Sequence, residues 1–404
     1  MLIIDKLDLN LGVGLFTMNK KDVADIRKQF KLNNKRMKIK DIFNVYVMKE
    51  SSEIYHQESK PFQMLEEEQQ ELFLSNFKKV LTGQLDVKLF ELKFQREAED
   101  HTQLLLYDGL QANDVEDWKA QMLLIVEKMF KNAQHTEDMV ATFVRCEYFK
   151  PTKKNNEEAE VSENDEVYSH QFILCSINKT VQPKKTLMFD YVERVFKYSV
   201  IVDPIINLAS PVAGFMFPCF TDNSGDVNRI LYCAEKANQP DEDFVVNVLN
   251  GEEFITAQED KAIFEEIVKE VVGEQVDAST LANVYEEINR IIDENEEEET
   301  PKLDYKDVER VLKVSGVEDV NTEKVETAFQ KVIDDEKHEF KASSVVPNYN
   351  TKSIKIQTKV ANISISPQDL KYVKQVNYNG KRCLLIEVDE DTVIEGFTLI
   401  PETF

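Results

Sequence analysis

The spacing of the apolar residues changes repeatedly along the chain between the period of a helix and the period of a strand. Helical spacing occurs at Val23, Ile26 and Phe30, and alternation of apolar and polar residues occurs within 353–357 and 360–365. The first pattern buries one stripe of a helix and the second buries one face of a strand, so the two are not interchangeable. The sequence therefore predicts an α+β protein with mixed helices, a largely antiparallel sheet, a helical segment and a small β-rich C-terminal module.

Local signals place the individual elements. Asn19 is expected to cap the first helix, with Asp22 at its third position. Helices are predicted near 20–31, 65–81, 115–130, 261–272, 281–292, 306–313 and 323–334, and also over 226–235. Strands are predicted over 42–48, 53–56, 85–94, 139–149 and 167–177, with 191–202 extended. The dipeptide Asn379-Gly380, between two strand-like segments, predicts a hairpin.

The length of 404 residues suggests two or three domains. An acidic run at 293–301 that ends in Pro301 is predicted to be a hinge, and the polar, acidic segment 151–166 a solvated loop. The predicted organisation is an N-terminal extension (1–17), a main α+β domain (18–272), a helical segment after an acidic hinge (273–342) and the β-rich module (343–404).

Composition limits the partners and the compartment. The net charge is −26, from 75 acidic and 49 basic residues, which argues against nucleic acid or an anionic membrane covering the whole surface. The five cysteines are scattered and contain no C-x-x-C pair, so a disulfide framework or a zinc site is not expected. The first residues lack the pattern of a signal peptide, and the longest apolar region, 199–220, is broken by polar residues and prolines. We expect a cytoplasmic protein without a membrane partner.

A basic stretch near the start of the chain is the first candidate site. Clustered lysines and arginines can neutralise phosphates, so the stretch is a candidate for nucleic-acid binding. A solvated helix face, or an internal dock for the acidic stretches, is the simpler explanation and is favoured. The candidate residues are Lys20, Lys21, Arg27, Lys28, Lys31, Lys35, Arg36, Lys38 and Lys40.

The segment from 222 to 226 is a candidate site for a divalent cation. The oxygens of Asp222, Ser224 and Asp226 alternate in a way that could coordinate a hard cation. The spacing does not match an EF-hand loop, and a turn whose Ser224 or Asp226 caps the following helix is the simpler explanation. The turn is the favoured interpretation.

Asp86, Glu91 and Lys93 are a candidate nuclease site. Some metal-dependent nucleases hold the metal with an acid and an E-x-K triplet on a strand, where the lysine stabilises charge. Such triplets also arise by chance in a highly charged chain, and the alternation of Val87, Leu89 and Glu91 fits an ordinary half-exposed strand. The ordinary strand is favoured.

The apolar segment 205–220 is predicted to be a loop with a fixed path, because it contains several prolines and Gly214. Loops held in this way often carry function. A buried crossover or a contact between subunits would explain the same residues.

Several stretches together resemble the bacterial family known as "domain of unknown function 4317". They are 18–27, 80–85, 172–177, 214–222 and the hairpin at 379–381, of which 214–222 is the most specific. The resemblance covers 18–404, implies a cytosolic protein and assigns no reaction. Residues 1–17 precede the family's usual start, so both Met1 and Met18 are candidates for the natural start, and 151–166 is longer than in the family pattern.

No phosphate-binding, dinucleotide-binding or nucleophile-elbow motif occurs in the sequence. The sequence therefore favours a non-catalytic binding or assembly protein whose partner is another protein or a second copy of the chain. The alternative is a nucleic-acid-binding protein or a metal-dependent nuclease that uses the basic stretch. No cofactor is predicted, although a divalent cation is a candidate ligand for the segment 222–226.

Overall fold

The structure is a computed structural model in which the chain forms two compact units, one up to Phe254 and one from Ile255 onward. The described residues are 18–96, 101–131, 135–151, 167–181, 186–199, 203–220, 224–273, 276–294, 301–335, 337–347, 353–388, 392–394, 397–398 and 400. The predicted N-terminal extension, nearly all of the acidic loop and residues 295–300 of the hinge lie outside them.

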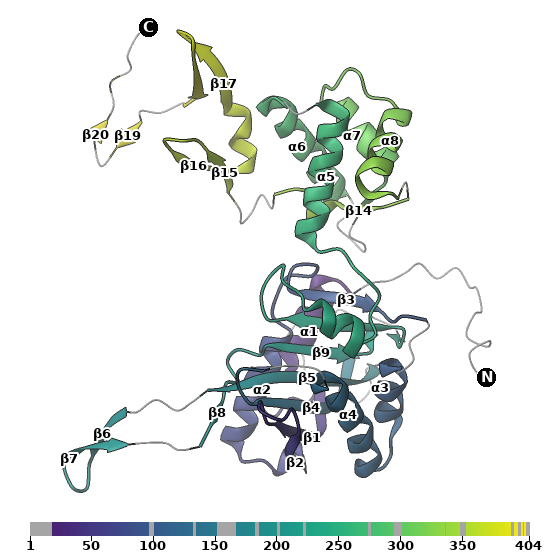
Figure 1. The fold of residues 1–404 in the computed structure, drawn as a ribbon, viewed down its shortest axis with the longest axis vertical. Coiled ribbons are helices and arrows are strands. Elements are labelled where there is room, and N and C mark those ends of the chain that lie inside the picture. The colour runs from purple at the N-terminus through teal and green to yellow at the C-terminus, as the bar shows by residue number, and fades with distance from the viewer. Residues whose placement is uncertain are drawn as a thin grey trace. The chain divides into compact units, whose positions relative to one another are not determined.

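The first unit is built on an eight-stranded sheet whose paired strands are all antiparallel (Figure 1). Seven strands follow the order β2-β1-β4-β5-β9-β12-β3, and the short β8 pairs with β5. The strands are β1 (Met37–Val47), β2 (Ile54–Pro61), β3 (Leu89–Lys93), β4 (Met139–Pro151), β5 (Val167–Val181), β8 (Ile205–Ile206), β9 (Ala213–Phe217) and β12 (Arg229–Ala234).

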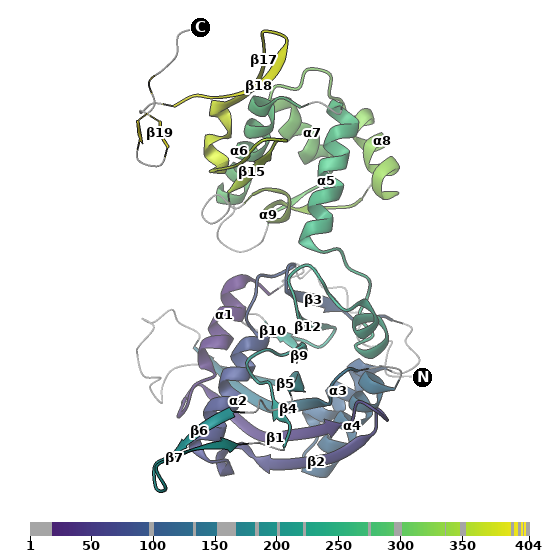
Figure 2. The same cartoon turned by 60° about the vertical axis from the view of Figure 1, so that its left-hand side comes forward.

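Helices cover both faces of this sheet. Figure 2 shows α1 and α2 on one side of the strands and α3 and α4 on the other. Neighbouring residues of the central strands enter opposite cores, as Phe143 and Val144 of β4 do. The helices are α1 (Lys20–Gln29), α2 (Glu67–Val80), α3 (Thr102–Gln111) and α4 (Val115–Phe130), with single turns η2 (Phe62–Met64) and η3 (Phe244–Val248).

The predicted helix over 226–235 is wrong, because Arg229–Ala234 form the strand β12. Every residue of β12 is buried, since the strand lies inside the sheet and has a core on each face. A strand buried on both faces loses its alternation of apolar and polar residues, so its sequence can be mistaken for a buried helical turn.

The segment 205–220, predicted to be a loop, contains the central strand β9 and the short strands β8 and β10 (Cys219–Phe220), and β10 pairs with β11 (Gly225–Asp226). Gly214 of β9 lies where a side chain would not fit. A Cβ at this position would be 2.7 Å from the carbonyl oxygen of Cys175 and 2.7 Å from a methyl group of Val80. The segment therefore contains strands of the sheet and is not one continuous loop.

The second unit is a small helical core with α5 (Ala257–Val272), α6 (Ala278–Glu294), α7 (Tyr305–Val314), α8 (Thr322–Ile333), α9 (Ala342–Val345) and the strand pair β13 (Lys302–Leu303) and β14 (Phe340–Lys341). The sequence groups α5 with the main domain. In the structure α5 packs here instead, with the rings of Phe264 and Phe340 5.6 Å apart.

The C-terminal residues form separate two-stranded pairs rather than one compact β module. The pairs are β15 (Ile354–Gln357) with β16 (Asn362–Ile365), β17 (Val373–Tyr378) with β18 (Lys381–Ile386), and β19 (Val393–Ile394) with β20 (Phe397–Thr398), joined in part by η4 (Pro367–Tyr372). Leu370 belongs to the core of the helices. The predicted hairpin is confirmed, since Asn379 and Gly380 both have a positive φ, 49° and 75°.

Candidate functional site

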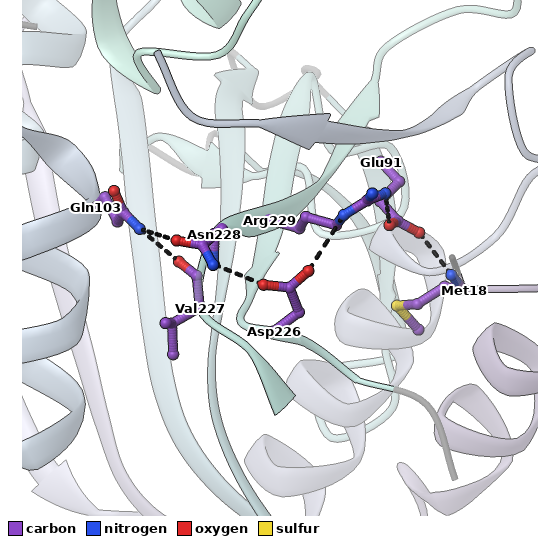
Figure 3. Close-up of polar contacts among 7 residues, drawn as sticks. All are labelled: Met18, Glu91, Gln103, Asp226, Val227, Asn228 and Arg229. Atoms are coloured by element: carbon purple, nitrogen blue, oxygen red, sulfur yellow. Dashed lines mark hydrogen bonds and ion pairs between the residues drawn. The ribbon is translucent and has the colours of Figure 1, made fainter. Parts of the chain in front are cut away.

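Arg229 joins two acidic residues that are far apart in the sequence (Figure 3). Its Nη1 lies 2.6 Å from Oε1 of Glu91 on β3, and its Nε lies 3.2 Å from Oδ2 of Asp226. The side chains of Arg229 and Glu91 are only 8% and 9% exposed. We call Glu91, Asp226 and Arg229 the arginine cluster.

The remaining carboxylate oxygens of the cluster also accept hydrogen bonds. The backbone N–H of Met18 donates to Oε2 of Glu91 at 2.6 Å, and that of Asn228 donates to Oδ1 of Asp226 at 2.9 Å. Gln103 of α3 donates to the carbonyl oxygen of Val227 in the same turn, at 2.9 Å. Each of the four carboxylate oxygens thus has a donor in the protein, so the arrangement fixes a turn and the start of α1.

Of the three nuclease candidates, Glu91 belongs to the arginine cluster. Asp86 lies in the turn before β3 with a φ of 60°, and Lys93 is exposed at the end of β3. Glu91 is used by Arg229 and Met18. A metal ligand needs a carboxylate oxygen that faces the ion, and each carboxylate oxygen of Glu91 faces a donor of the chain itself. The geometry gives the nuclease hypothesis no support.

The metal candidates are only partly visible. Asp222 lies outside the described residues, Ser224 is exposed, and Asp226 is bound to Arg229 and Asn228. Asp226 does cap a backbone N–H, as the turn interpretation expects, but the next element is the strand β12 rather than a helix. The part of the chain that the structure describes contains no group of three acidic, cysteine or histidine residues placed to hold a metal.

The basic stretch extends over α1, the following turn and the first residues of β1. Arg27 and Arg36 are half-buried, whereas the lysines are exposed at positions 20, 21, 28, 31, 35, 38 and 40. Acidic and aromatic side chains lie among them, because Lys28 is 3.9 Å from Asp25 and Lys38 lies over the ring of Phe149. The stretch is a mixed surface, not a continuous basic groove.

Four of the five cysteines are buried, and burial raises the pKa of each of their thiols: Cys146, Cys175, Cys219 and Cys233. At Cys219 the carboxylates of Glu91 and Asp226 raise the pKa further. A thiol with a raised pKa remains protonated and is a poor nucleophile. These cysteines therefore fill the core.

A hairpin in the first unit forms a two-stranded sheet of its own, made of β6 (Thr186–Asp190) and β7 (Val195–Ser199) (Figure 1). Leu187 lies opposite Tyr198, and Phe189 lies opposite Phe196. Residues directly opposite each other in an antiparallel pair, and residues two apart on one strand, share a face. These four side chains therefore form one face of the hairpin, which we call the apolar face.

The apolar face is open to solvent. Leu187 is 68% exposed, Phe189 41%, Phe196 73% and Tyr198 60%. Tyr191, at the turn, is 85% exposed, and its ring lies 5.2 Å from that of Phe189. Monomeric proteins rarely leave so many large apolar side chains together at the surface unless the surface binds something.

The opposite face of the hairpin is more polar. Met188 lies across from Lys197, and Asp190 lies across from Val195. Lys197 is 2.9 Å from Asp190 and 2.6 Å from Glu193 in the turn. The hairpin is therefore amphipathic, with ion pairs on one face and aromatic rings on the other.

The sequence predicts only an extended segment over 191–202 and does not identify this hairpin. Only part of its signal is present: Phe196 and Tyr198 alternate with Lys197 and Ser199, but Met188 between Leu187 and Phe189 is itself apolar. The intervening turn has Arg194 in the left-handed region, with a φ of 55°. Arginine is an uncommon residue in that region, so no turn motif marks the position.

The sequence was compared with family models, curated proteins and solved structures. A family model described as "Domain of unknown function (DUF4317)" matches residues 18–397. No curated protein and no solved structure matches the chain. Among the described helices, none is both long enough and apolar enough to cross a membrane. The match spans nearly the whole chain and confirms the resemblance predicted from the sequence, so the chain belongs to the DUF4317 family.

Proposed function

We propose that the chain is a binding or assembly protein that makes its contact through the apolar face of the β6–β7 hairpin, and that it acts in the cytoplasm. The exposure of that face is the observation that carries the proposal. An isolated two-stranded hairpin is at best marginally stable in water, and a partner that covers its apolar face would stabilise it. The five free thiols suit a reducing compartment.

The cysteine thiols and the carboxylates of the arginine cluster support a binding role over a catalytic one. The buried thiols have raised pKa values, and every carboxylate oxygen of the arginine cluster accepts a hydrogen bond or ion pair from the chain. The arginine cluster thus holds the fold together and the buried thiols fill the core.

Two neighbouring residues provide a matched test of this proposal. Leu187 belongs to the apolar face and Met188 to the opposite face, and both are exposed, at 68% and 53%. In affinity capture from the native cell with nuclease treatment, Leu187→Glu is expected to lose the protein that wild type retains, because a charge cannot be buried against an apolar partner. Met188→Glu adds the same charge and should retain it.

The captured protein must then bind the purified chain directly, and Leu187→Glu must weaken that binding. If wild type and both variants recover the same proteins in the same amounts, the hairpin is not the contact surface. Capture that survives Leu187→Glu would point to another surface.

Nucleic-acid binding by the basic stretch is the alternative, and the exposure of its seven lysines is the observation that favours it. The leading proposal expects no retardation of duplex DNA or RNA in gel shifts at about 50 mM salt, because the chain carries a net charge of −26. A shift that weakens steeply with salt would support the alternative. The double variant Lys20→Glu/Lys21→Glu should then abolish it, while Lys337→Glu, at an exposed lysine of the second unit, should not.

A further inference from the structure

We propose that the apolar face of the β6–β7 hairpin binds the same face of a second copy of this chain, an inference that rests on the proposed binding function. In such a dimer the two hairpins pack face to face about a two-fold axis. Leu187, Phe189, Phe196 and Tyr198 of each copy then form one interface. A two-fold interface requires a surface that is complementary to itself, and a small sheet with one apolar face meets that requirement.

The exposed area fits a dimer of this kind. The four side chains of the apolar face and Tyr191 are on average about two-thirds exposed. With roughly 200 Å² for a large side chain, they leave on the order of 700 Å² open on each copy. A stable interface typically buries about 800 Å² on each partner. Two apolar faces therefore come close to the area that a specific dimer needs.

The charge distribution also favours a second copy. The chain as a whole has a net charge of −26, so two copies repel each other over most of their surface. The hairpin is an exception, because residues 186–199 contain two acidic residues, Asp190 and Glu193, and two basic residues, Arg194 and Lys197. Its net charge is zero, so hairpins can meet without adding to the repulsion between the chains.

The same charges argue against a lipid surface as the occupant. Asp190, Glu193 and Arg194 lie at the turn, the part of the hairpin that would enter a bilayer first. Burying charged groups in hydrocarbon is costly, and an acidic chain is repelled by anionic lipids.

The test is the molar mass of the full chain across a range of concentrations, measured by sedimentation equilibrium and light scattering. Wild type is expected to be a dimer that dissociates on dilution. Leu187→Glu and Phe196→Glu should each weaken dimerisation at least about tenfold, as expected of central interface residues. Met188→Glu, on the opposite face, should change the dissociation constant less than about threefold.

A second measurement looks for a new covalent link between two copies and does not rely on a variant that fails to dimerise. At least one of Leu187→Cys, Phe189→Cys, Phe196→Cys and Tyr198→Cys should form a disulfide between two copies on mild oxidation, because a residue near the two-fold axis meets its own equivalent. Met188→Cys should cross-link much less, and wild type, which has the partly exposed Cys383, gives the background.

Three outcomes would overturn the proposal. A wild-type monomer up to about 100 μM would exclude a specific dimer, while hairpin-dependent binding of another protein would leave the proposed function standing. A dimer that Leu187→Glu and Phe196→Glu leave intact would place the contact elsewhere. If affinity capture by Leu187→Glu were also the same as by wild type, both the dimer and the proposed binding function of the hairpin would be wrong. Sedimentation with phosphatidylcholine vesicles that depends on Leu187, without self-association, would favour a lipid surface.

Discussion

Replacing Arg229 with methionine is expected to lower the free energy of unfolding of the first unit by about 3–5 kcal/mol, the loss typical of breaking a buried ion pair. Methionine occupies a similar volume but leaves the carboxylate of Glu91 buried without its cation. The ion pair between Arg229 and Glu91 is 2.6 Å long and both side chains are more than nine-tenths buried. The backbone N–H of Met18 carries no full positive charge, so its hydrogen bond does not replace the guanidinium.

Urea unfolding followed by tryptophan fluorescence would measure this change. Trp118 is the one tryptophan of the chain and is fully buried beside the sheet of the first unit, so its emission reports on that unit. Lys60→Met is the control, because Lys60 and Glu58 form a pair 2.7 Å long in which both side chains are about half exposed. Its loss should be below about 1 kcal/mol.

The double variant Glu91→Gln/Arg229→Met tests the cause. It removes both charges, so its loss should be smaller than that of Arg229→Met alone. If Arg229→Met lowers the free energy of unfolding by no more than Lys60→Met does, Glu91 is not confined to a buried environment. The arginine cluster would then not be the structural element that its contacts indicate.

Replacing Gly214 with alanine should cost about 2–3 kcal/mol, the upper part of the range for adding a methyl group to a packed core. The new Cβ would lie 2.7 Å from the carbonyl oxygen of Cys175 and 2.7 Å from Val80. The side chain of Val80 can rotate, but the oxygen belongs to the neighbouring strand β5 and moves only if the sheet opens. The backbone contact therefore sets most of the cost.

The same unfolding measurement tests this prediction. Gly225→Ala is the matched control, since its nearest neighbour would be a carbon of Pro218 at 3.4 Å, an ordinary contact. It should change stability by less than about 0.5 kcal/mol. Adding Val80→Ala to Gly214→Ala should relieve only the side-chain contact, while wild-type stability in Gly214→Ala itself would contradict the close approach of β9 and β5.

Elements with strong local signals agree between sequence and structure. The capping box at Asn19 and Asp22 begins α1 as predicted, and the helix predicted over 115–130 is α4. The hairpin at Asn379 and Gly380 is equally local, because two residues with positive φ set it. Predictions failed where burial on two faces removed the pattern, as in β12. They also missed α3, β6 and the strand character of β9.

The sequence by itself determined the family, the α+β class and most of the local elements, because capping, turn residues and apolar spacing act over a few neighbouring residues. Only the tertiary structure decided which strands pair and which charges meet. Glu91 and Arg229 are 138 positions apart, and Glu91 and Asp226 look from the sequence like two separate candidate sites. The tertiary structure also decided that the apolar face of the β6–β7 hairpin stays exposed to solvent. Burial is the sum of contacts with distant residues, and no local pattern contains that sum.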